Sequence, residues 1–199
     1  GGLPGGHRRD RHGRQVGAGD LMSGPREDSQ DELVSLARKA IEAYVEDRAV
    51  VDAGEISGLE PRQAGVFVCL HSPDGSLRGC IGTFQPTCTS IEQEIVRNAI
   101  SAATRDPRFS PLDRRELSDL DISVDVLGEP EEVSGVQDLD PKIYGIIVQT
   151  ADGRQALLLP DLEGVDTAEQ QLRITARKGG IDPDADRIRL FRFRVERHH

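Results

Sequence analysis

The sequence predicts an α+β fold with a mainly antiparallel sheet flanked by helices. Two strand–turn–strand patterns dominate the chain, one with turn residues at Ser72–Ser76 and one with the pair Asp152-Gly153. Long helical patterns are few, and we find no internal repeat. Hairpins join strands that run in opposite directions, whereas parallel strands need long crossover segments. The pattern therefore favours antiparallel strands with a few helices packed on them.

The first expected element is a helix over about residues 30–50. Ser29 and Glu32 have capping-box spacing, and apolar residues then recur at helical intervals: Leu33, Leu36, Ala37, Ala40, Ile41, Tyr44 and Val45. Residues 1–28 hold eight glycines and five arginines, a composition that buries too little apolar surface to order itself. We expect 1–28 to be a disordered tail and 29–199 to be the folded domain.

A hairpin over residues 66–84 follows, and its register stays open. If His71 lies opposite Ser76, then Cys69 and His71 share the face of Cys80. If His71 instead lies opposite Leu77, the parity changes and both point away, because a slip of one residue moves a strand's side chains to the other face.

The remaining elements alternate between helix and strand. Their expected ranges are a helix at 90–104, a short helical turn at 112–118, strands at 121–127, 144–150, 154–159 and 187–195, and a helix at 168–178. Two further capping-box pairs precede the helices, Thr89 with Glu92 and Thr167 with Gln170. The apolar parity of the last strand switches between Leu190 and Phe191, which indicates a bulge or burial on both faces.

Charge and composition exclude several classes of function. The net charge of −10 argues against nucleic-acid binding, although residues 187–197 at the C-terminal end carry five arginines. Ten acidic residues lie within 113–140, against two arginines. No apolar run approaches the roughly 20 residues of a membrane span. The three cysteines are too few, and odd in number, for a disulfide framework, so we expect a reduced, cytoplasmic protein.

The segment 77–84 contains the main candidate site. Cys80 lies between Gly79 and Gly82, and Arg78 precedes it by two residues, on the same face of a strand. A guanidinium near a thiol favours the nucleophilic thiolate. Cys80 is therefore a candidate nucleophile or ligand contact, with His71 as the nearby base in sequence; the alternative is a small residue packed under the hairpin.

Two other interpretations of this region remain open. Arg78 either binds an anionic ligand or forms a salt bridge with the acidic segment 113–140. Four soft metal ligands also lie within twenty residues, but the spacing of Cys69, His71, Cys80 and Cys88 matches no common zinc pattern. We therefore assign no metal site, and no cofactor is indicated.

Several motifs together resemble the AMMECR family, protein A of the AmmeMemoRadiSam system. They are Gly65-Val66-Phe67-Val68, Leu77-Arg78-Gly79-Cys80-Ile81-Gly82, Asn98-Ala99, Asp106-x-Arg108-Phe109-x-Pro111, Ile122-Ser123-Val124, Leu157-Leu158-Leu159-Pro160 and Lys178-Gly179-Gly180. The resemblance implies a main antiparallel sheet, a smaller second subdomain and a cleft near the cysteine motif. It also places Asn98 and Arg108 with Arg78, Gly79 and Gly82 as candidate ligand-binding residues.

Two functions follow as hypotheses, and whether the protein is an enzyme stays open. In the first, the cleft around Arg78 and Cys80 binds a small anionic or electrophilic ligand, with thiol catalysis as one mechanism. In the second, the protein is a non-catalytic partner of a Memo-type or radical SAM protein, as the family's gene association implies. Neither hypothesis involves nucleic acid or a membrane.

Overall fold

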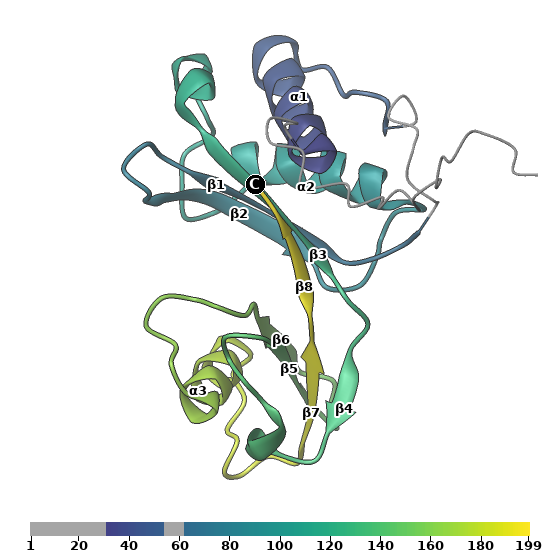
Figure 1. Ribbon diagram of the computed structural model, residues 1–199, viewed down its shortest axis with the longest axis vertical. Coiled ribbons are helices and arrows are strands. Elements are labelled where there is room, and N and C mark those ends of the chain that lie inside the picture. Colours follow the sequence, from purple (N-terminus) through teal and green to yellow (C-terminus); the bar gives the residue numbers. More distant parts are fainter. Residues whose placement is uncertain (1–30, 54–61) are drawn as a thin grey trace, which may run out of the picture.

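The computed structural model, which describes residues 31–53 and 62–199, contains two four-stranded antiparallel sheets in two lobes (Figure 1). The first sheet has the order β2-β1-β3-β8, and the second has the order β4-β7-β5-β6. This confirms the α+β prediction. The expected disordered tail at 1–28 lies outside the described residues. No helix in the described ranges is long and apolar enough to span a membrane.

The first sheet is covered by two helices on one face. Its strands and helices are β1 (Val66–His71), β2 (Leu77–Thr83), β3 (Asp121–Leu127), β8 (Val195–His198), α1 (Glu32–Asp47) and α2 (Ile91–Thr104). Side chains alternate along a strand, so Val66, Val68 and Leu70 are buried in the core with the helices. The alternate residues of β1 face the second lobe, where Cys69 and His71 line a cleft.

The second lobe packs its sheet on a single α-helix. Its elements are β4 (Glu131–Val133), β5 (Gly145–Thr150), β6 (Gln155–Leu158), β7 (Ile188–Phe193), α3 (Ala168–Lys178) and the short 3-10 helix η3 (Val136–Asp138). β4 and η3 were not predicted. A second 3-10 helix, η2 (Arg114–Asp119), precedes β3 at the expected place.

The helix caps correct two of the sequence predictions. The N-cap of α1 is Asp31, whose side chain accepts a hydrogen bond from the backbone of Leu33; Ser29 lies outside the described residues. The N-cap of α2 is Ser90, one residue after the predicted Thr89. Thr167 and Gln170 do form the predicted capping box of α3.

A two-stranded ribbon runs through both sheets and joins the lobes (Figure 1). One strand of the ribbon continues from β3 into β4, and the other continues from β7 into β8. Where the two strands pass from one sheet to the other, the Gly128 N–H donates to the Arg194 carbonyl oxygen over 2.8 Å.

The switch in apolar parity expected between Leu190 and Phe191 has its cause in the two faces of β7. Leu190 packs in the core with α3, while Phe191 packs in the apolar cluster between the lobes. Burial on both faces is thus the correct alternative.

The basic last strand is largely neutralised by ion pairs. Arg189 pairs with Glu132, Arg192 with Glu131 and Arg197 with Asp125, at N–O distances of 2.6, 3.1 and 2.7 Å. The arginines of β7 and β8 and the acids of segment 113–140 thus meet within the ribbon.

Replacing Gly79 with alanine should destabilise the first lobe. A Cβ at this buried position would collide with the main-chain carbonyl oxygen of Ala102 in α2. We expect Gly79→Ala to lower the free energy of unfolding in urea by about 2–3 kcal/mol. Gly75→Ala is the comparison variant, because its Cβ meets open space and only its φ of +81° opposes the change. Equal unfolding midpoints for Gly79→Ala and the wild type would contradict this packing.

Candidate functional site

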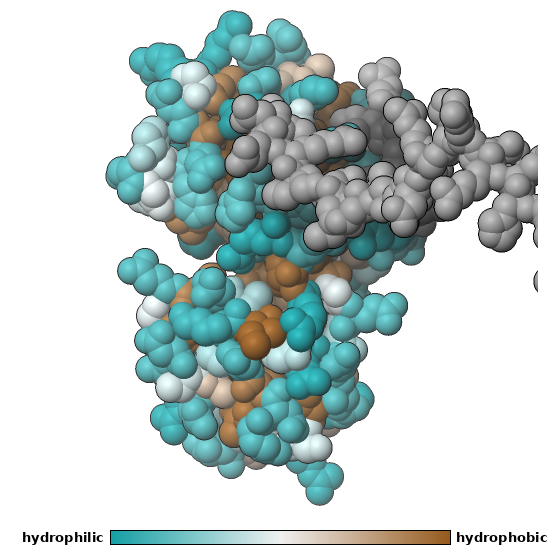
Figure 2. Space-filling view, viewed as in Figure 1, coloured by the Kyte–Doolittle hydropathy of each residue, from teal (hydrophilic) through white to brown (hydrophobic). Residues whose placement is uncertain are grey.

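A cleft of about 530 Å³ lies between the two sheets, on the face of the first sheet that carries no helix. Figure 2 shows the surface indented between the two lobes on the left of the view. Its first wall is Phe67, Cys69, His71, Leu77, Cys80, Ser123, Asp125 and Arg197 from the first sheet, with His199. Facing it are Leu157, Leu158, Leu159, Asp161, Leu162 and Glu163. Arg108 and Lys178 complete the lining.

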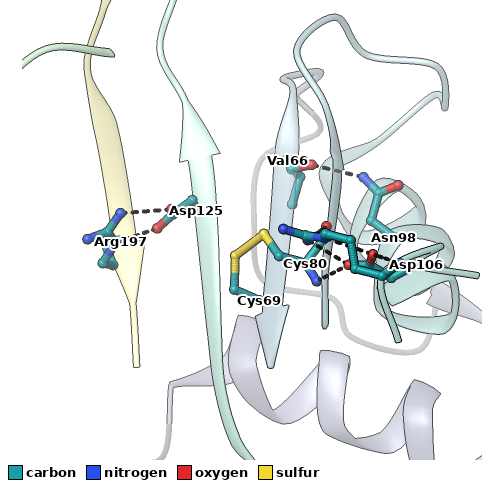
Figure 3. Close-up of a disulfide and its surroundings, with 8 residues drawn as sticks. Val66, Cys69, Cys80, Asn98, Asp106, Asp125 and Arg197 are labelled. Atoms are coloured by element: carbon teal, nitrogen blue, oxygen red, sulfur yellow. Dashed lines mark hydrogen bonds and ion pairs between the residues drawn. A yellow bond between two sulfur atoms is a disulfide. The ribbon is translucent and has the colours of Figure 1, made fainter. Parts of the chain in front are cut away.

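A disulfide between Cys69 and Cys80 forms part of the cleft wall (Figure 3). The two residues lie directly opposite each other on β1 and β2, with Cα atoms 4.1 Å apart. This corrects the expectation of a reduced protein with free thiols. Cys80, the candidate nucleophile, has no free thiol in this state, so nucleophilic chemistry at Cys80 requires the reduced pair. Cys88 is a free cysteine.

The hairpin register differs from both registers considered from the sequence. An irregularity between Leu70 and His71 places His71 opposite Leu77, yet leaves Cys69 opposite Cys80. His71 and both cysteines therefore line the same cleft. Arg78 of β2 is the extra residue, because it has no partner in β1. It keeps His71 on the same face of the sheet as the two cysteines, although His71 lies opposite Leu77.

Asp106 and Arg108 hold the outer edge of β2 at Cys80. β2 is an edge strand, so the outward N–H and C=O of Cys80 have no strand partner. The Cys80 N–H donates to Asp106 Oδ2 over 2.9 Å, and Arg108 Nη2 donates to the Cys80 carbonyl oxygen over 3.2 Å. Arg108 also binds both carboxylate oxygens of Asp106, over 2.9 and 2.7 Å.

In this ion pair Asp106 is buried, whereas Arg108 lines the cleft. The Asp106 side chain is 2% exposed and the Arg108 side chain is 54% exposed. The Arg108 hydrogen bonds, joined by that from Cys80, hold the pKa of the Asp106 carboxyl well below its usual range. Asp106 therefore stays ionised and fixes Arg108 at the rim of the cleft.

Lys178 brings a second cation to the cleft from the other lobe. It is the last residue of α3, and its Nζ donates to the Leu157 carbonyl oxygen over 3.0 Å. Burial lowers the pKa of the Lys178 ammonium, and the positive charge of Arg108 lowers it further. Within residues 31–53 and 62–199 we find no carboxylate within ion-pair distance of Lys178.

Arg78 lies outside the cleft, in an ion pair with the acidic segment. Its Nε and Nη2 donate to the two carboxylate oxygens of Glu116 over 2.7 and 3.1 Å, and Nη1 donates to the Ser110 carbonyl oxygen. The side chain is 15% exposed. Of the two interpretations of Arg78, the structure contains the salt bridge.

Three other predicted ligand-binding residues have packing roles. Gly79 is buried against α2, and Gly82 lies under the Phe67 ring. Asn98 is 2% exposed and donates to the Val66 carbonyl oxygen over 2.9 Å (Figure 3). Of the predicted site residues, only Cys80, His71 and Arg108 meet in the cleft.

Sequence reasoning missed the contribution of the second lobe. Lys178 was noted only as part of a helix end, and the leucines of 157–159 only as part of a hairpin. The local signal that could have pointed to Lys178 is its position directly before Gly179-Gly180, because the last side chains of a helix can reach neighbouring segments. As for the alternative of a metal site, no group of three His, Cys, Asp or Glu side chains in the described ranges is placed to hold a metal ion.

Comparison with known proteins finds clear relatives. The AMMECR1 family matches residues 34–198. A protein of Thermotoga maritima is 50% identical over 167 residues, covering 83% of this chain and 95% of its own length. A protein of Clostridium acetobutylicum is 45% identical over 172 residues; the match covers 85% of this chain but 36% of that longer protein. The crystal structure of an uncharacterised protein from Pyrococcus horikoshii superposes with a TM-score of 0.74 at 32% identity, covering 83% of this chain and 88% of that one.

Replacing Asp106 with asparagine should destabilise the protein at neutral pH. The variant loses the charge that binds Arg108 and the Cys80 N–H, so we expect the free energy of unfolding at pH 7 to fall by roughly 1–3 kcal/mol. The Asp106 pKa is lowered in the folded state. Its stabilisation is therefore present above the unfolded pKa of about 3.9 and is lost as the pH falls further.

The urea unfolding difference between wild type and Asp106→Asn should accordingly shrink between pH 7 and pH values below about 4. Glu132→Gln serves as the control, because it breaks an exposed ion pair with Arg189 and should change stability little. A difference that grows towards acid pH would contradict the assignment.

Proposed function

The chain belongs to the AMMECR1 family, and from this premise we propose that it binds a small anionic molecule in the cleft between its lobes. The observation that carries the proposal is the meeting of Arg108 and Lys178, which come from different lobes. Arg108 is already paired with Asp106, whereas Lys178 has no carboxylate within ion-pair distance in the described part of the chain, so an anion beside the two cations would compensate the charge of Lys178. This supports a ligand with a carboxylate or phosphate group.

The size and lining of the cleft support a ligand of metabolite size. Its volume of about 530 Å³ falls within the usual range of about 300–1,000 Å³ for small-molecule sites. Leu157, Leu159 and Phe67 supply apolar surface beside the cations. Such a combination suits a molecule with one charged end and a short apolar body.

Thiol chemistry is compatible with this site only after reduction. Cys80 then carries a thiol on the cleft wall, and His71 lines the same cleft as the candidate base. An electrophilic ligand held by Arg108 and Lys178 would meet that thiol. In the disulfide state, the site binds without nucleophilic catalysis.

The second hypothesis, a non-catalytic partner of a Memo-type or radical SAM protein, stays a prediction, as does the cytoplasmic location. A partner surface would tolerate the loss of a cleft cation, whereas ligand binding would not. The variant Lys178→Gln therefore separates the two hypotheses.

Small anions should raise the thermal unfolding midpoint of the protein. The probes are butyrate, succinate, inorganic phosphate and glycerol 3-phosphate, with neutral butyramide for comparison. At about 100 times its dissociation constant, a ligand adds roughly 2.7 kcal/mol, a rise of about 5–10 °C for a chain of this size. We expect at least one anion to produce a rise, and butyramide to produce none.

Lys178→Gln should abolish the rise, because it removes the cation that has no carboxylate within ion-pair distance in the described part of the chain. Arg177→Gln is the matched control: it removes a neighbouring positive charge on the same helix that does not line the cleft. No rise with any of the four anions, or an equal rise in Lys178→Gln, would contradict the proposal.

A further inference from the structure

The disulfide in the cleft wall is placed where a small molecule can reach it. Cys69 and Cys80 are both partly exposed and both line the cleft. A disulfide sulfur is attacked by a thiolate only when the thiolate has access to it. The sulfurs face the volume beside Arg108 and Lys178, on the side of the sheet opposite the helix-covered core.

The hairpin does not need this disulfide to keep its shape. β1 pairs with β2 on one side and with β3 on the other, and its alternate residues pack under α2. The main chain of Cys80 is also held by Asp106 and Arg108. Breaking the S–S bond leaves these contacts in place, so the oxidised and reduced proteins can share one fold.

We propose that Cys69 and Cys80 form a redox-active pair that exchanges with small anionic thiols in the cleft. This inference rests on the proposed anion binding and names its ligand class: a thiol that carries a carboxylate. Arg108 and Lys178 attract the carboxylate, and they also favour the thiolate form of the incoming sulfur and of the departing one.

The exchange balances with two thiol molecules. The first thiolate attacks one sulfur of the pair, forming a mixed disulfide; the Cys69–Cys80 bond breaks, and its electron pair leaves with the other sulfur. The second thiolate attacks the sulfur of the bound thiol and releases the small-molecule disulfide. The protein gains two electrons and two protons, which the two thiols lose. The reverse reaction reoxidises the pair.

The test compares three thiols of similar size and different charge on the full chain. These are 3-mercaptopropionate, 2-mercaptoethanol and 2-mercaptoethylamine, at equal thiolate concentration and without oxygen. Samples are quenched in acid and alkylated, and mass spectrometry counts the free thiols. The background is Cys88→Ser, which removes the third cysteine. We expect two new thiols, released about tenfold faster by the anionic thiol than by the cationic one.

Four variants test the charge preference and the pairing of the two cysteines. Lys178→Gln should bring the rates of the anionic and cationic thiols close together, whereas Arg177→Gln should preserve the preference. Cys69→Ser, exposed to the oxidised form of 3-mercaptopropionate, should accumulate one stable adduct on Cys80, because no second cysteine resolves the mixed disulfide. Cys80→Ser should likewise accumulate one adduct on Cys69.

Three outcomes would overturn the proposal: two free thiols in the air-oxidised folded protein, reduction only in denaturant, or equal rates for the three thiols. Its failure is distinguishable from failure of anion binding, because the probes of the thermal unfolding experiment carry no thiol.

Discussion

The whole arrangement depends on one ribbon that is hydrogen-bonded into both sheets. Its two strands, Asp121–Val133 and Ile188–His198, leave one sheet side by side and enter the other. Phe193 and Leu127 are buried at the passage, with Phe67, Phe84 and Phe191 packed around them. This apolar cluster fixes the separation of the lobes, and the cleft is the space that the cluster leaves unfilled on one side.

Local structure could be predicted from this sequence where one segment contains all the relevant information. The strand over 121–127 and the capping box of α3 were both predicted as found. The parity switch at Leu190 and Phe191 was visible too, but its cause was not, because it depends on two different partners for the two faces of one strand. β4 has three residues and acquires its pattern only from pairing with β7.

The candidate site was predicted in part, and the missing part is long-range. Cys80, His71 and Arg108 do meet in the cleft. Of the two interpretations of Arg78, the salt bridge with segment 113–140 is the one found, at Glu116, 38 residues further along the chain. Alternation along a regular strand could not decide between a ligand and this salt bridge, because the choice depends on a segment that is distant in the sequence. The disulfide was likewise hidden by an irregularity at Leu70 and His71, which no composition or spacing reveals. Lys178 depends on how α3 docks on β6.

The hydrogen bond between Gly128 and Arg194 has a mechanical consequence. Gly128 lies between β3 and β4, and Arg194 lies between β7 and β8, so the bond is made where the ribbon passes from one sheet to the other. Because both strands continue from one sheet into the other, the twist of this ribbon sets the orientation of one lobe relative to the other. Arg108 and Lys178 lie in different lobes, so the twist of the ribbon also sets how far apart the two cations stand.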